Sequence, residues 1–239
     1  MPTPVHYIPI ATTVLAIFFA PIVFKRWKER RPAPHLLWWA FGIAAYGIGT
    51  FTEGFTTLFG WNEWVFRSWY ISGALLGGAP LAQGTVFLMF SRKTATIMAV
   101  AVGAAIIVGA TVVMMAPIDY SQVESHRLTG AVMEWRQARL FSPFINTYAA
   151  IFLIGGAILS AWRYRRDPEA RHRFIGNCFI AFGALLPGIG GTATRFGHTE
   201  VLYVMEFLGI ILIWIGYRYN VMPGARGAPR ATEGAIATG

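Results

Sequence analysis

Apolar residues run through this chain in long blocks that short polar segments separate. Seven blocks are long enough to cross a bilayer as helices of about 20 residues each. They cover residues 5–24, 36–59, 65–91, 95–116, 143–162, 174–195 and 200–219. We therefore predict an all-α membrane protein, a seven-transmembrane-helix bundle that forms one domain over residues 1–221. The tail over residues 222–239 is rich in Pro, Gly and Ala, and we expect it to be disordered in the cytoplasm.

Composition supports the membrane assignment. The chain has 239 residues, of which 55% are hydrophobic and only 13% charged, and its mean hydropathy is +0.50. These values are too apolar for a soluble domain of this size. The single cysteine, Cys178, excludes an internal disulfide framework and a metal cluster built on cysteines.

The net charge of +9 does not indicate a nucleic-acid partner, because its distribution follows the membrane blocks. Lys and Arg concentrate in the cytoplasmic loops of membrane proteins. Here all but five of the 20 basic residues follow the first, third, fifth and seventh blocks. This pattern predicts an N-terminus outside and a C-terminus in the cytoplasm of a bacterial inner membrane, with membrane lipids as partners. The five exceptions are Arg67, Arg127, Arg136, Arg139 and Arg195.

We expect no cleavable secretory signal at the start of the chain. No Lys or Arg precedes Lys25, so the basic n-region of a cleavable signal peptide is missing, and KRWKERR follows the first apolar block directly. We expect the first helix to remain in the mature protein.

The second block contains one carboxylate, Glu53, inside the run FGIAAYGIGTFTEGFTTLFG. A charged residue within a membrane helix is a functional-site hypothesis by default. At helical spacing, Glu53 shares a face with small residues that allow close helix packing. That face consists of Gly42, Tyr46, Gly49, Glu53, Thr57 and Gly60. Glu53 is therefore predicted to point into the bundle.

A second carboxylate, Glu206, lies at a similar depth in the last block, and Arg67 and Arg195 lie nearer the outer ends of their helices. Two interpretations remain open. The charges can form a structural network that locks the helices together, or they can line an outward-opening polar pocket. The predicted ligand-binding residues are Glu53, Arg67, Tyr70, Gln83, Arg195, Tyr203 and Glu206. If Glu53 and Glu206 face each other without an arginine between them, one would keep its proton and could act as a catalytic acid.

Two further features concern the helices and their connections. Pro80 and Pro187 fall in the middle of predicted helices and should kink them. In the long connection Ile118 to Pro143, Leu128 and Val132 share a face with Trp135, which predicts a short helix on the membrane surface. This connection is either a lid over the outer end or a passive connector. Trp69 and other tryptophans near block ends are interpreted mainly as interfacial anchors.

The chain can also be tested for an internal repeat. A shift of 137 positions places Arg26 on Arg163, His35 on His172 and Thr57 on Thr194. This register makes a 3+1+3 parallel repeat a hypothesis, in which the fourth helix links two three-helix units.

Cofactor motifs are missing. All five histidines fall at helix ends or in loops, which argues against axial ligation of a haem, and no HExxH motif is present. The last block has no lysine for a retinal Schiff base. We expect no cofactor and no metal.

The run from LLWWAFGIAAYGIGTFTEGF to LMF, with SAWRYRR, RFIGNCFIAFGALLPGIGG and LYVMEFLGIILIWIGYRY later, resembles a family of bacterial seven-helix membrane proteins of uncharacterised function. The pattern of the second and third helices is also similar to the seven-helix sensory domains of some histidine kinases, although no kinase follows here. A further resemblance is to membrane-integral terpene cyclases, which carry one acidic residue in helix two and one in helix seven. Glu53 and Glu206 match those positions, but the motifs around them differ.

The favoured function is a receptor-like or accessory protein that binds a small or lipid-like ligand in an outward-facing pocket. One alternative is a membrane-embedded enzyme that uses Glu53 or Glu206 as an acid on a lipid or isoprenoid substrate. Another alternative is a small-solute transporter. A membrane protein partner or a homo-oligomer is compatible with each of these functions.

Overall fold

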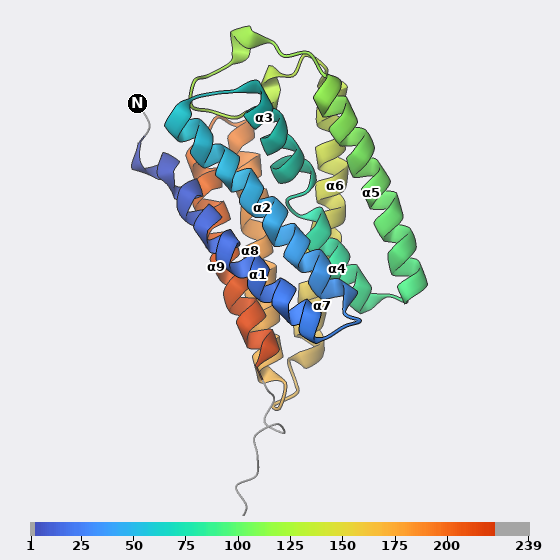
Figure 1. Cartoon of the computed structure of the whole chain (residues 1–239). Helices are drawn as coiled ribbons and strands as arrows, with labels where there is room; N and C mark the ends of the chain where they lie inside the picture. Colours follow the sequence, from blue (N-terminus) through green and yellow to red (C-terminus); the bar gives the residue numbers. More distant parts are fainter. Residues whose placement is uncertain (1–2, 223–239) are drawn as a thin grey trace, which may run out of the picture.

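The computed structural model describes residues 3–222, except for the side chain of Arg195. Within this range the chain forms helices and turns, and no strand (Figure 1). Nearly all of the predicted tail lies outside the described residues. The helices are α1 (Ile8–Glu29), α2 (Pro34–Phe59), α3 (Glu63–Trp69), α4 (Ala79–Met89), α5 (Arg92–Met115), α6 (Phe141–Ala149), α7 (Gly155–Tyr164), α8 (Arg171–Arg195) and α9 (Thr199–Val221).

Singly or joined in series, most of these helices form segments with the length and apolarity of membrane spans. Six helical segments in the described range qualify, namely Pro4–Glu29, Glu63–Met89, Arg92–Met115, Arg136–Tyr164, Arg171–Thr194 and Thr199–Val221. The helix α2 has 26 residues and is not among these six segments; glycine and threonine recur along it. Large apolar side chains also cover the outside of the bundle, as at Ile17, Val100 and Phe182. The fold is therefore an all-helical bundle with six to seven helices able to span a membrane.

The segment predicted as one helix over residues 65–91 is interrupted. It consists of α3, a π-helical turn (Tyr70–Leu75), a bend at residues 76–78, and α4. The prediction of a mid-helix kink at Pro80 is wrong, because Pro80 lies in the first turn of α4. A proline is tolerated there, since the first amide groups of a helix have no partner within it. Pro187 does lie inside α8.

The long helices run between two ends of the bundle (Figure 1). The α1–α2, α4–α5 and α7–α8 connections lie together at one end, here named the basic end because most of the described Lys and Arg residues gather there. The other end, the loop end, carries the long connection before α6. The helix α2 packs on α1 and α4, and α9 packs on α1 and α8. The helix α5 lies at the edge.

Residues 116–140, here named the capping loop, close part of the loop end. The predicted short helix on the membrane surface is not formed. The loop contains three 3₁₀ turns, Tyr120–Gln122, Gly130–Val132 and Arg136–Leu140. Leu128 and Val132 are buried in a core cluster with Phe66 and Tyr70. The hydroxyl of Tyr120 donates to Glu63 Oε2 at 2.6 Å, and this hydrogen bond raises the pKa of Tyr120. The loop therefore packs on the bundle, because its apolar side chains are buried against the helices there.

The helices α8 and α9 approach each other through glycines. A Cβ atom on Gly183 would lie 2.7 Å from the backbone oxygen of Gly209, and one on Gly209 would lie 2.8 Å from that of Gly183. Other glycines of α8 lie outside this contact, since a Cβ on Gly188 or Gly191 would meet no described atom within 4 Å. Close backbone approach of this kind is typical of membrane helices.

Substitution of Gly183 by alanine is expected to destabilise the bundle by about 1–3 kcal/mol, because the added methyl group meets backbone that cannot move aside. The matched variant Gly188→Ala adds the same methyl group to open space on the same helix. It should be neutral or stabilising by up to about 1 kcal/mol through helix propensity. Thermal unfolding of both variants in detergent, followed by circular dichroism, provides the comparison. Equal melting temperatures would contradict the packing described here.

Candidate functional site

The two carboxylates that the sequence placed at equal depth meet in the bundle interior. Glu53 on α2 is 2% exposed, and its side chain lies within hydrogen-bonding reach of that of Glu206 on α9. The indole Nε1 of Trp69 on α3 donates to Glu53 Oε1 at 2.9 Å. The hydroxyl of Tyr46 donates to the backbone oxygen of Glu206, also at 2.9 Å. The pair therefore joins α2, α3 and α9.

The pair lacks donors for its remaining oxygens. Among the described residues, Glu53 Oε2 and Glu206 Oε2 are buried and have no hydrogen-bond partner. Two ionised carboxylates offer only acceptors, so they bond to each other only when one carries a proton. A single shared proton satisfies both groups and avoids two adjacent buried charges. With one shared proton the pair would be a carboxylic acid beside a carboxylate, a combination that can release or accept one proton.

Arg67 does not join this pair. Its Nε and Nη2 donate to Glu63 Oε1 at 3.0 and 2.7 Å, and Nη2 also donates to the backbone oxygen of Ala116 at 2.9 Å. A further bond runs from Nη1 to the backbone oxygen of Val113. These carbonyl groups lie at the C-terminal end of α5. The last carbonyl groups of a helix have no donor within the helix and carry a partial negative charge. Arg67 therefore caps α5 and holds it to α3.

The other predicted site residues lie in separate parts of the structure. Gln83 is fully buried between Tyr148, whose hydroxyl donates to its Oε1, and the backbone oxygen of Ala95, to which its Nε2 donates at 2.8 Å. Tyr70 is buried in the core cluster beneath the capping loop. The side chain of Arg195 lies outside the described residues. Of the predicted set, the structure brings together Glu53, Glu206 and Tyr203, which lies one turn before Glu206 on α9 and is 2% exposed.

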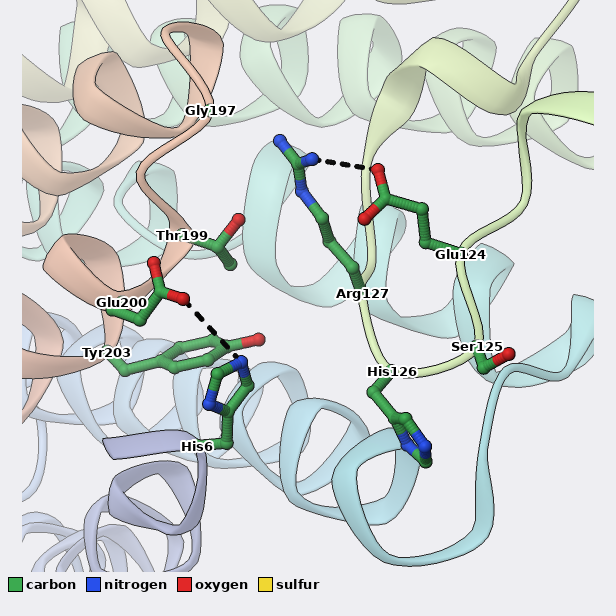
Figure 2. A pocket seen from close by; sticks show the side chains of 9 residues that line it. All are labelled: His6, Glu124, Ser125, His126, Arg127, Gly197, Thr199, Glu200 and Tyr203. Carbon is green, nitrogen blue, oxygen red and sulfur yellow. Dashed lines mark hydrogen bonds and ion pairs between the residues drawn. The ribbon is translucent and has the colours of Figure 1, made fainter. Parts of the chain in front are cut away.

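A polar cavity of about 330 Å³ opens at the loop end, and Tyr203 forms part of its wall (Figure 2). Four segments line it: the N-terminal turn, the capping loop, the α8–α9 turn and the start of α9. The lining residues are His6, residues 124–127, Gly197, Thr199, Glu200 and Tyr203. The site thus differs from the predicted one, since its polar groups come mainly from the ends of helices and from the capping loop.

Hydrogen-bonding capacity inside this cavity is only partly used. Thr199 is 6% exposed, and among the described residues its Oγ1 and the Nε of Arg127 are buried without a partner. Arg127 Nη1 donates to Glu124 Oε1 at 2.8 Å, and His6 Nε2 lies 3.8 Å from Glu200 Oε1. Figure 2 shows the hydroxyls of Thr199 and Tyr203 and the side chain of Arg127 directed toward the same space. Buried groups of this kind normally find a partner.

Several residues of these two sites escaped the sequence interpretation, among them Trp69, Arg127 and Thr199. Trp69 was assigned to the membrane interface, and nothing in its local sequence indicated a contact with Glu53. Arg127 carried a usable signal, since it is one of only five basic residues outside the cytoplasmic segments. Thr199 could not be recognised as a site residue from the sequence, because threonine is common at the start of helices.

The described part of the chain has no group of three or more His, Cys, Asp or Glu residues placed to hold a metal ion. A scan against protein-family models finds no match to the chain, and a search of curated proteins finds none. Function is therefore argued from the two sites alone.

Proposed function

We propose that this protein is a receptor-like or accessory protein of a membrane and that it binds a small or lipid-like ligand in the polar cavity at the loop end. The observation that carries the proposal is the buried, unpartnered hydroxyl of Thr199 in a cavity of about 330 Å³. Ligand sites combine a concave surface with a few convergent polar groups. A ligand would satisfy the donors that the described residues leave free.

The finer membrane topology belongs to the same proposal. We infer a seven-helix bundle in a bacterial inner membrane, with α2 as a span shielded by its neighbours. The gathering of Lys and Arg at the basic end supports a cytoplasmic location for that end and an outward location for the cavity. The 3+1+3 repeat remains a hypothesis of this proposal.

A tryptophan in place of Ser125 is expected to abolish ligand retention, because Ser125 lines the cavity on the capping loop and a side chain of that size in the wall would narrow the space. Native mass spectrometry of the full chain, extracted in mild nonionic detergent, would report the retained mass. The matched control is Gln122→Trp, an exposed position in the same loop outside the lining. We expect an adduct on the wild type and on the control and none on Ser125→Trp. A chain that carries no adduct in any form, or an adduct that all three forms keep, would contradict the proposal.

A second function is favoured by one specific observation, the contact between Glu53 and Glu206. A buried carboxylic acid beside a carboxylate can protonate an apolar substrate, as a membrane enzyme acting on a lipid or isoprenoid would require. In that function Glu53 and Glu206 are the catalytic acid pair. Loss of product formation in both Glu53→Gln and Glu206→Gln, once a substrate is known, is the expected result.

A further inference from the structure

The cavity at the loop end has two chemically different sides. On one side hydrogen-bond donors converge, and on the other side stands a carboxylate that is incompletely paired. This division indicates which ligand the cavity fits. The inference rests on the proposed function, because it names the ligand class of the same cavity.

The donor side is built on the N-terminus of α9. The first amide groups of a helix point out of it and carry a partial positive charge, which favours an anion. In the described structure no side chain caps α9, whose N-cap residue is His198. The hydroxyl of Thr199, the first residue of α9, is buried without a described partner and is directed into the cavity (Figure 2). The helix end and the hydroxyl together form a site for an oxyanion.

Arg127 faces this helix end across the cavity, and its Nε has no partner among the described residues. Its bond to Glu124 does not prevent ligand binding. That pair is three residues apart, and the Glu124 side chain is 58% exposed. Exposed pairs of this kind contribute little to stability, because water screens them and the side chains lose freedom on pairing. A planar guanidinium can therefore turn to an oxyanion that accepts from two of its N–H groups.

The acceptor side is Glu200. Its Oε1 lies 3.8 Å from His6 Nε2, which is longer than a hydrogen bond, and its side chain is 49% exposed. A carboxylate has capacity for several donors. Glu200 is the next residue after Thr199, so the acceptor lies beside the oxyanion site. A ligand that brings only negative charge would lie against this carboxylate and would be repelled.

We propose that the cavity binds a zwitterion that carries an oxyanion and a primary ammonium group. The oxyanion accepts from Thr199, the first amides of α9 and Arg127, and the ammonium donates to Glu200. A free amino-group metabolite and a phosphoethanolamine lipid headgroup share this chemistry. The position of the cavity at one end of the spanning helices is compatible with both sources.

Isothermal titration calorimetry of the full chain in nonionic detergent tests directly whether the ligand is such a zwitterion. Three probes are compared: O-phosphoethanolamine, inorganic phosphate and ethanolamine. We expect O-phosphoethanolamine to bind at least about tenfold more tightly than either of the others, because only it engages both sides. Thr199→Val should weaken its binding by about 5–10-fold, as expected for the loss of a hydrogen bond to a charged group. Glu200→Gln should remove the preference over phosphate while phosphate affinity is kept or increased.

Matched controls are Thr192→Val, a threonine on α8 that bonds to its own helix, and Glu134→Gln, an exposed glutamate of the capping loop. Both should leave the affinities unchanged. A second arm distinguishes the sources. Retention of phosphatidylethanolamine over phosphatidylglycerol in native mass spectrometry, lost in Glu200→Gln, identifies the lipid. Binding of the free probe without retained lipid identifies a soluble ligand.

Equal affinities for phosphate and O-phosphoethanolamine would overturn the inference, and so would an absence of binding in both arms. The proposed function can survive that result. A retained molecule without an ammonium group that Ser125→Trp displaces would refute the zwitterion but support the cavity as the binding site.

Discussion

Replacement of Arg67 by methionine is expected to lower the free energy of unfolding by about 3 kcal/mol, the range observed when one partner of a buried charged network is removed. Arg67 is 6% exposed, and its guanidinium donates hydrogen bonds both to Glu63 and to the last carbonyl groups of α5. Methionine fills the space but leaves those carbonyls without a donor. Chemical or thermal unfolding in detergent micelles measures the loss.

The control for this variant is Arg139→Met, which changes an exposed arginine of the capping loop. It should alter stability by no more than about 0.5 kcal/mol. Arg67→Lys is expected to fall near the methionine variant, because an ammonium group cannot reproduce the planar fork. Full stability of Arg67→Lys would show that charge alone matters and that the helix-capping geometry does not.

Glu53 is expected to tolerate glutamine but not leucine. Glutamine still accepts from Trp69, and its amide can donate to Glu206 as a protonated acid would, so stability should change by less than about 1 kcal/mol. Leucine leaves the indole N–H of Trp69 and the carboxylate of Glu206 without their partner. The expected loss is about 3 kcal/mol, since an unsatisfied buried polar group costs about 1–3 kcal/mol and a charged one more.

Infrared spectroscopy tests the shared proton independently of stability. The wild type should show the carbonyl stretch of a protonated carboxylic acid, and the double variant Glu53→Gln, Glu206→Gln should lack it. If the band is absent from the wild type and Glu53→Gln is as damaging as leucine, both carboxylates are ionised and the interpretation of the pair is wrong.

The sequence revealed that the chain is all-helical with six to seven helices long and apolar enough to span a membrane, because apolar length is a direct physical requirement of the bilayer. It also placed Glu53 and Glu206 at similar depth in their helices and left open whether they face each other. It misplaced Arg67, whose partners are backbone carbonyls of another helix and leave no trace in side-chain patterns. Glu63, four residues before Arg67, was the one local indication of its real partner.

The cavity was the least predictable part. Its wall combines His6, the capping loop and the start of α9, which lie far apart in the chain and meet only after the helices pack. The interruption between α3 and α4 was missed for a related reason. Glycines and a proline were visible there, but whether they kink a helix or end it depends on the neighbours that satisfy the freed backbone groups.

The most direct test of the account is an experimental density map of the full chain purified with its native lipids. The account predicts non-protein density in the cavity between Thr199 Oγ1 and the guanidinium of Arg127, with Glu200 on its other side. A map in which the Arg127 side chain itself fills the cavity and donates to Thr199 would contradict it.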